Sequence, residues 1–457
     1  AVGAASTLGY ATQSVSASHG TVRMNVEDQR SDGDTLVIAA GQFDADVRLA
    51  VRLGSGLEST HTISAGTTVS NRTIDLEHTV QDTQVANLRA YESGTDRLLD
   101  WDIAIVSVDE PIGAVEINDV LDDGYELVPS DSAAGFQYPY YLYAPGPIED
   151  STQPLIVQGN NSPLPKAGPR NHVLFAKNMI EGLVDRFAAE FQVPALVPAF
   201  PRLQREPPPR TRSHLYVQAL TDRALRTDHP TLARADRQLM RMVDDAQRRL
   251  RGDGYTPTEQ VHMHGFSTSG RFAPRIAMLH PERVSAVSAG GNGMYTLPTA
   301  EFDGQTLPYP VGVSDLESLV GAEFDLDEWR TIHHYFYLGD DDTSDSLNRL
   351  RAELRDLVDE IHPSSVTDRF EMVESVHDSV GASATFEIYD GIGHRTAPQQ
   401  VEDLREFHWA QMDVEHSRQG VPVRDLALFT GALAAAAGGL VGLAYALPRL
   451  LDDDSDA

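Results

Sequence analysis

Short runs in which apolar and polar residues alternate dominate the chain from residue 20 to about residue 112. Two clear examples are residues 35–40 and 45–51, and turn-forming residues such as those at 31–34 separate the runs. Alternation with a period of two is typical of strands that bury one face. Because several short strands with turns about every ten residues are typical of a two-sheet stack, we expect a small β-sandwich domain over residues 20–112.

The pattern changes after a boundary near residues 111–125, where longer helical segments begin to separate the apolar runs. Alternating strands and helices favour a parallel sheet with helices on both faces. We therefore expect a mostly parallel α/β domain over residues 125–416, in a chain long enough for more than one core. Strands are expected at 138–144, 155–157, 195–197, 260–264, 335–338 and 384–389, and helices at 173–191, 231–250 and 271–280.

The segment 425–448 differs from both domains, because no charged residue lies between Asp425 and Arg449. At 1.5 Å per residue, such a helix is long enough to cross the hydrocarbon core of a membrane. The alternative is a buried helix rich in Ala and Gly, but only the acidic tail 449–457 follows to cover it. We expect one transmembrane helix here.

Residues 1–19 are small, mostly apolar and uncharged up to Val15-Ser16-Ala17, which matches the end of a signal peptide and its cleavage site. A plain flexible N-terminus is the alternative. Together with the expected membrane helix, this segment predicts a protein held in the cell membrane by a single C-terminal anchor, with its folded domains outside the cell.

The net charge is −32, from 68 Asp and Glu against 36 Lys and Arg, and Lys occurs only at 166 and 177. Molar salt shortens the Debye length to about 3 Å and removes most of the self-repulsion of such a surface. The charge therefore indicates a halophile, best matched by a haloarchaeon, and predicts that nucleic acid is not a partner. The absence of Cys excludes disulfides, thiolate nucleophiles and Cys-ligated zinc.

The residues Gly265-Phe266-Ser267-Thr268-Ser269 follow an expected strand and precede an expected helix. This is the context of a nucleophile elbow, a sharp turn that lifts a Ser hydroxyl above the edge of a sheet. Ser269 stands where Gly is usual. A turn without chemistry is the alternative reading of so short a motif.

Two later strand ends carry the groups that would activate Ser267. They follow it in the order Ser, acid, His that is expected after a nucleophile elbow. The G-x-x-D spacing from Gly339 points to Asp342 as the acid, with Asp340, Asp341 and Asp345 as competitors. A solvated acidic turn or a cation-binding loop is the alternative for this cluster. His394 follows the last expected strand and is the candidate base.

A Ser nucleophile that attacks a carbonyl carbon also needs N–H groups directed at the oxyanion that forms. We expect one donor from Thr268 and another from Asn160 or Asn161, in a loop that departs from the usual H-G-G-G sequence. His262 and His264 share one strand face, but no third ligand appears at a spacing typical of zinc. We therefore expect neither a metal nor a cofactor.

The motif 265–270, followed by 280–284 and 289–291, resembles uncharacterised microbial α/β-hydrolases related to polyester depolymerases and feruloyl-type esterases. The resemblance spans about residues 130–410 and implies hydrolysis of a small-molecule or polymeric ester. Residues 26–36 resemble the opening of a β-sandwich module of haloarchaeal surface proteins. The alternatives are a serine peptidase or amidase, and a surface-binding protein that has lost activity, which the departures at Ser269 and Asn160 would favour.

Overall fold

The computed structural model describes residues 22–412 apart from 27–28, 32, 54–56, 78–79, 81–83, 96–97, 108–123, 149–150, 162–168, 205–213, 216, 294, 344–351 and 364. The expected signal-like segment 1–19, the membrane helix 425–448 and the tail 449–457 lie outside these residues. Among the helices within the described ranges, none has the length and apolar character needed to span a membrane.

The N-terminal part of the chain forms two sheets. One has the order β1-β3-β6 and the other has the order β2-β8-β7-β4-β5. Except for the parallel pair β2–β8, neighbouring strands are antiparallel. The strands are β1 (Val22–Asn25), β2 (Gln29–Arg30), β3 (Thr35–Phe43), β4 (Val47–Leu53), β5 (Leu57–Ile63), β6 (Thr67–Asp75), β7 (Gln84–Glu92) and β8 (Leu98–Ser107).

The two N-terminal sheets share one hydrophobic cluster. Leu36 and Ile38 of β3 belong to it together with Leu49 and Val51 of β4 and Leu88 of β7. The burial of every second residue in the first half of β3 is the alternation seen in the sequence. Burying this apolar face is the main stabilising contribution, at roughly 25 cal/mol per Å² of apolar surface.

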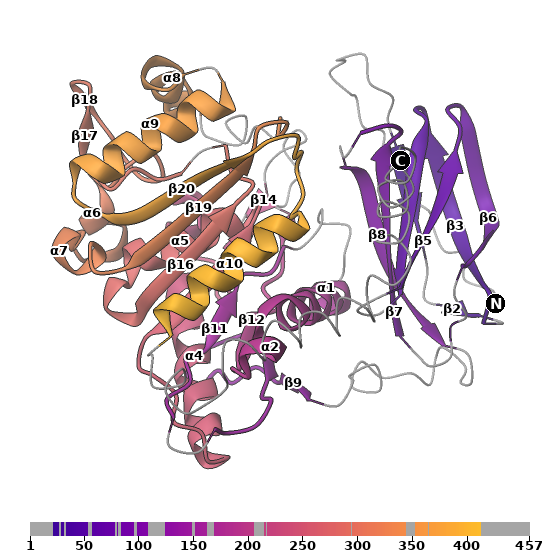
Figure 1. Ribbon diagram of the computed structural model, residues 1–457, viewed down its shortest axis with the longest axis horizontal. Helices are drawn as coiled ribbons and strands as arrows, with labels where there is room; N and C mark the ends of the chain where they lie inside the picture. The colour runs from indigo at the N-terminus through magenta and orange to yellow at the C-terminus, as the bar shows by residue number, and fades with distance from the viewer. Residues whose placement is uncertain are drawn as a thin grey trace, which may run out of the picture. The chain divides into compact units, whose positions relative to one another are not determined.

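The second part of the chain is built on one eight-stranded sheet with the order β20-β19-β16-β15-β11-β12-β10-β9 (Figure 1). β10 runs antiparallel to both of its neighbours, and the strands from β12 to β20 are parallel. The predicted, mostly parallel α/β sheet is thus confirmed. Its strands are β9 (Tyr125–Val128), β10 (Tyr140–Tyr143), β11 (Ile156–Gln158), β12 (Ala195–Pro198), β15 (Val261–Phe266), β16 (Val284–Gly290), β19 (His333–Gly339) and β20 (Ser383–Tyr389).

Helices cover both faces of this sheet. The predicted helix 173–191 consists of α1 (Pro169–Leu183), a π-helical turn (Val184–Ala188) and α2 (Ala189–Phe191), whereas 231–250 and 271–280 correspond to α4 (Ala235–Gly252) and α5 (Ser269–Leu279). The later helices are α8 (Ala352–Ile361), α9 (Val366–Ser379) and α10 (Pro398–Gln411). Shorter elements are α3 (Asp222–Leu225), α6 (Leu316–Val320), α7 (Leu326–Trp329), the 3-10 turns η4 (Val217–Ala219) and η5 (Pro281–Arg283), and the strand pairs β13–β14 (Leu203–Gln204, His214–Leu215) and β17–β18 (Glu301–Phe302, Gln305–Thr306).

The two faces of β15 have different partners. Successive side chains of a strand point to opposite faces. Met263 lies in the core cluster with residues of α4, α5 and α9, whereas His262 and His264 contact His408 of α10 on the other face. β15 is therefore buried on both sides, which is why its sequence does not show the alternation of an exposed strand.

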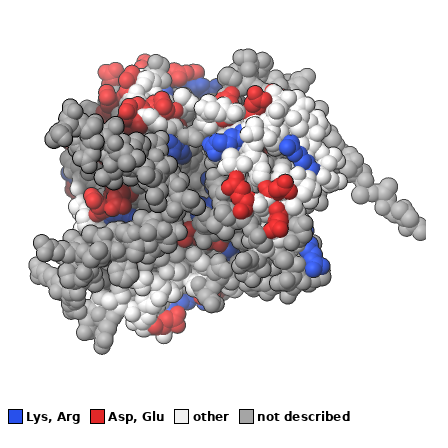
Figure 2. Space-filling view, turned by 45° about the vertical axis from the view of Figure 1, so that its right-hand side comes forward, with Lys and Arg blue, Asp and Glu red and all other residues white. Residues whose placement is uncertain are grey.

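Arginines pair with part of the acidic surplus at the surface. Examples are Arg226 with Asp315 at 3.0 Å and Arg283 with Asp244 at 2.9 Å. On the face in Figure 2, acidic groups form several separate patches with basic side chains between them. Exposed pairs of this kind stabilise a protein by only about 0–1 kcal/mol each, so the surplus of 32 negative charges dominates the surface electrostatics.

Candidate active site

Ser267 stands on the turn between β15 and α5, in a backbone conformation that few residues other than Gly adopt. Its φ angle is 61°, and a non-Gly residue in this region costs about 1–3 kcal/mol. The Ser267 N–H donates a hydrogen bond of 2.8 Å to the carbonyl oxygen of Gly290 at the end of β16. The surrounding structure therefore holds a strained turn, as the elbow motif predicts.

Small residues around Ser267 are required by close approaches of the backbone. A Cβ on Gly265 would lie 2.1 Å from the carbonyl oxygen of Ser269, and one on Gly270 would lie 2.4 Å from that of Gly290. Ser269 fits where Gly is usual, because its buried hydroxyl accepts the Phe266 N–H and also lies 3.0 Å from the Phe266 carbonyl oxygen, to which it can donate. The departure at Ser269 thus contributes hydrogen bonds to the turn.

The loops after β19 and β20 are joined to each other at the carboxyl edge of the sheet. The Asp341 N–H donates to the Ile392 carbonyl oxygen at 3.2 Å, and the Gly391 N–H donates to Asp340 Oδ1 at 2.7 Å. Gly339 is needed for this approach, since a Cβ there would lie 1.8 Å from Ile392 O. These contacts hold the two loops that carry the candidate acid and base.

His394 lies between Asp342 and Ser267. His394 Nδ1 is 2.8 Å from Asp342 Oδ2, and His394 Nε2 is 2.8 Å from Ser267 Oγ. A carboxylate only accepts hydrogen bonds, so Nδ1 carries the proton of a neutral imidazole and Nε2 accepts from the Ser267 hydroxyl. The ring centroid of His394 is 5.0 Å from that of Phe266.

Burial separates Asp342 from the other candidate acids. Asp342 is 3% exposed, whereas Asp340 and Asp341 are exposed, and Asp340 accepts from Gly391 as described above. Asp345 lies outside the described residues. Among the described carboxylates of this cluster, Asp342 is the one at hydrogen-bond distance from His394.

The side-chain amides of the two candidate oxyanion residues after β11 contact other parts of the protein. Asn160 Nδ2 donates to the Phe200 carbonyl oxygen at 2.8 Å. Asn161 Nδ2 donates to the Phe266 carbonyl oxygen at 2.9 Å, and Asn161 Oδ1 accepts the Ser269 N–H at 2.8 Å. Backbone N–H groups therefore remain the candidates for oxyanion donors in this loop. Thr268, the third candidate, is the residue that precedes the first turn of α5.

A hydrogen-bonded chain that the sequence did not predict connects α10 to β15 and β16. Ser288 Oγ lies 2.7 Å from both His264 Nδ1 and His408 Nε2, and His408 Nδ1 lies 3.3 Å from His262 Nδ1. All four side chains are buried. Within the described ranges, no group of three or more His, Asp and Glu residues is placed to hold a metal ion. The two histidines noted in β15 thus belong to a hydrogen-bond chain.

Burial changes the ionisation of the three histidines in this series of hydrogen bonds. It lowers the pKa of His262 to about 4, and it lowers the pKa values of His264 and His408 well below the ordinary value of 6.5. The physical cause is the loss of hydration of an imidazolium. The three rings are therefore neutral at neutral pH, and each hydrogen bond in the chain uses one N–H or O–H donor.

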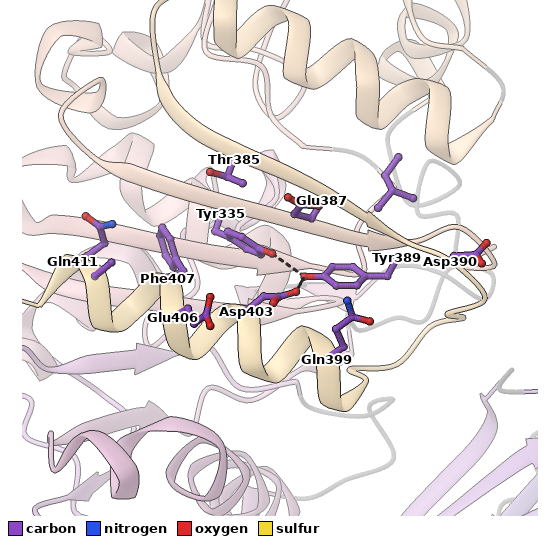
Figure 3. Close-up of a pocket in the computed structure, with 12 residues that line it drawn as sticks. Tyr335, Thr385, Glu387, Tyr389, Asp390, Gln399, Asp403, Glu406, Phe407 and Gln411 are labelled. Carbon is purple, nitrogen blue, oxygen red and sulfur yellow. Dashed lines mark hydrogen bonds between the residues drawn. The ribbon is translucent and has the colours of Figure 1, made fainter. Parts of the chain in front are cut away.

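A separate open groove of about 790 Å³ lies between the edge strand β20 and α10 (Figure 3). Its lining includes Glu387, Asp403 and Glu406 but none of Ser267, Asp342 and His394. On its floor, Tyr335 Oη and Tyr389 Oη are 2.7 Å apart, and the Tyr389 hydroxyl donates to Asp403 Oδ2 at 2.5 Å. This contact connects the end of β20 with α10, the two elements between which the loop of His394 lies.

Comparisons with known proteins gave structural likenesses only. No family model matches the sequence, and no curated protein matches it. Among solved structures, a thermostable esterase is 14% identical with a TM-score of 0.36, over 81% of this chain and 91% of the esterase. Enterochelin esterase from Shigella flexneri is 10% identical with a TM-score of 0.37, over 86% and 96% of the two chains.

A third structure, acylaminoacyl peptidase from Pyrococcus horikoshii, is 10% identical with a TM-score of 0.37, over 87% of this chain and 64% of the peptidase.

The class of fold rests on the strand order and on the turn at Ser267. An eight-stranded, mostly parallel sheet whose fifth strand in chain order, β15, leads through a strained Ser turn into a helix has the architecture of the α/β-hydrolase fold.

Proposed function

We propose that this protein is a serine hydrolase that cleaves a carboxylic ester through an acyl-enzyme intermediate, with Ser267 as nucleophile, His394 as general base and Asp342 as its orienting acid. The observation that carries the proposal is the pair of 2.8 Å contacts that His394 makes with Asp342 and Ser267. A Ser hydroxyl is a weak nucleophile until a neighbouring base takes its proton.

In the proposed reaction, Ser267 Oγ attacks the ester carbonyl carbon while His394 Nε2 takes the hydroxyl proton. The carbonyl π electrons move to the oxygen, and the Asp342 carboxylate stabilises the imidazolium that forms. Collapse of this tetrahedral intermediate breaks the bond to the alcohol oxygen, which receives the proton from His394. A water molecule then repeats the sequence on the acyl-enzyme and releases the acid.

The oxyanion donors are proposed to be the backbone N–H of Thr268 and a backbone N–H of Asn160 or Asn161. Support comes from the position of Thr268 directly after the nucleophile and from the pairing of β11 with β15, which brings the loop after β11 next to the turn. One such donor typically contributes about 10²–10³-fold to kcat. The proposed reaction uses no cofactor.

Two alternatives share the same residues. A serine peptidase or amidase would use the same three groups on an amide, and a surface-binding protein would keep the fold without turnover. The ester preference follows from the resemblance of the motif 265–270 and its neighbours to esterases of this fold. The two departures that favour an inactive protein have structural partners, since Ser269 bonds to Phe266 and Asn160 bonds to Phe200.

A fluorophosphonate probe tests whether the protein is an active serine hydrolase. We expect the wild-type protein in high salt to be labelled covalently, and Ser267→Ala to show no labelling, because the probe reacts with an activated Ser hydroxyl. Intact-mass spectrometry measures the adduct. Absence of labelling in the folded wild type would favour the binding protein, and faster turnover of a matched anilide than of a nitrophenyl ester would favour the amidase.

We further propose that the protein acts outside the cell in a salt-rich medium, anchored in the membrane by residues 425–448. The uncharged segment and the net charge of −32 support this location. Cell fractionation should find the full chain in the membrane fraction, and a chain ending at residue 416 should be released into the medium. Recovery of the full chain in the cytosolic fraction would contradict the proposal.

A further inference from the structure

We propose that Asn161 is a positioning residue that clamps the turn carrying the nucleophile, a role that rests on the proposed function of Ser267. The Asn161 side chain contacts the residue before Ser267 and the second residue after it. Its Nδ2 donates to the Phe266 carbonyl oxygen at 2.9 Å, and its Oδ1 accepts the Ser269 N–H at 2.8 Å. One amide group therefore holds both sides of the strained turn.

Strand register explains why Asn161 reaches this turn. Gln158 at the end of β11 pairs with His264 in the parallel strand β15. Asn161 comes three residues after Gln158, and Ser267 comes three residues after His264. Because both strands run in the same direction, the two loops leave the sheet at the same edge. A side chain of this length can then span the gap between the loops.

The chemistry of the clamp requires an amide. The carbonyl oxygen of Phe266 accepts from Asn161 Nδ2 in addition to the Ser269 hydroxyl. The N–H of Ser269, which belongs to the first turn of α5, has no partner within the helix and needs an acceptor. Among short side chains, Asn supplies both groups in one plane. Its orientation is also determined, since the flipped amide would place oxygen against oxygen and N–H against N–H.

The clamp matters for catalysis because the position of Ser267 Oγ depends on the turn. Ser267 has a φ angle of 61°, and its Oγ lies 2.8 Å from His394 Nε2. A turn that relaxes toward an unstrained conformation moves Oγ away from the base and from the substrate carbonyl. Displacements of about 1 Å in such an arrangement lower the rate by roughly 10²-fold.

Asn161→Asp is the sharpest test, because it keeps the shape and the acceptor for Ser269 but replaces the donor to Phe266 with an oxygen. We expect kcat for a nitrophenyl ester to fall by about 10–100-fold, with KM changed by less than about 2-fold. The rate of fluorophosphonate labelling should fall by a similar factor.

Gln153→Glu is the matched control. Gln153 is another buried amide whose Nε2 donates to backbone carbonyl oxygens, those of Gln192 and Gly146, but it precedes β11 and so lies toward the amino edge of the sheet. The same change of amide to carboxylate is expected to lower the Tm while leaving kcat of the folded enzyme within about 2-fold. If Asn161→Asp does not fold, Asn161→Ala is measured in its place, with the same expected fall in kcat.

The outcomes separate the clamp from the proposed function. An active wild type whose Asn161 variant loses kcat while the Gln153 variant does not would support the clamp. An active wild type with kcat of the Asn161 variant within about 2-fold would overturn the clamp and leave the function intact. A wild type without turnover and without labelling at Ser267 would overturn the proposed function and the positioning role together.

Discussion

Replacing Asp342 with Asn is expected to lower kcat by about 10⁴-fold while KM and the Tm change little. The reason is the tautomer of His394. The Asp342 carboxylate only accepts, which keeps the proton on Nδ1 and leaves Nε2 to accept from Ser267. An amide at this position can donate to Nδ1, which places the proton on Nε2 and removes the base. Steady-state kinetics on a nitrophenyl ester measure the effect.

Asp341→Asn is the control for this prediction. The Asp341 side chain is exposed, and its backbone N–H supplies its bond to Ile392. The same change of carboxylate to amide, one residue away, should therefore leave kcat within about 2-fold. A large loss in Asp341→Asn together with a small one in Asp342→Asn would show that Asp342 is not the acid.

Acidification below about pH 6.5 is expected to unfold the protein progressively. Burial holds the pKa of His262 at about 4 in the folded state, below its ordinary value of 6.5, and those of His264 and His408 well below 6.5. Between about pH 6.5 and 4 the unfolded chain therefore binds more protons than the folded chain. The stability present above 6.5 is lost as pH falls, by about 1.4 kcal/mol per pH unit for each such histidine.

Denaturant unfolding at fixed salt between about pH 8 and 5 measures this loss. His262→Phe removes one titrating group. As pH falls, the free energy of unfolding of this variant should therefore decrease less steeply than that of the wild type. Ser288→Ala breaks two hydrogen bonds in the chain without removing a titrating group, so it should lower stability by a similar amount at each pH. Equal pH dependence in the wild type and His262→Phe would refute this account.

Loss of the hydrogen bonds among Ser288 and the buried histidines at low pH should also lower activity before global unfolding. Ser288 and His408 connect β16 with α10, and α10 begins four residues after His394. The Tyr389–Asp403 contact connects the start of the His394 loop to the same helix. Both contacts depend on α10 staying packed on the sheet, so a displacement of α10 would weaken both and with them the position of the His394 loop.

Much of the fold followed from local pattern. The strands near 35–40, 260–264 and 335–338 and the helices near 231–250 and 271–280 are present as β3, β15, β19, α4 and α5, although most bounds differ by a few residues. Helix ends depend on capping contacts as well as on apolar periodicity, which explains these differences. The π-helical turn Val184–Ala188 inside the predicted helix 173–191 gave no signal in the sequence.

The sequence predicted some residues of the candidate site better than others. Ser267 and His394 were recognisable because Gly-rich turns after strands have a local signature. The choice of Asp342 rested on its spacing from Gly339, and the structure adds the 2.8 Å contact and the burial that distinguish it from Asp340 and Asp341. Asn161 was noted only as an oxyanion candidate, and its contact with the turn has no signature in the sequence.

The residue types and their order could be read from the amino-acid sequence alone: a strained turn at Ser267 after one strand, then Asp342 and His394 after two later strands. These features are local, because a strand, a turn and the small residues they require lie next to each other in the chain. Which of these groups meet depends on the tertiary structure. Asp342 and His394 are 52 residues apart, and Asn161 and Ser269 are 108 residues apart. Strand order and register bring them together, and these depend on the packing of the whole sheet.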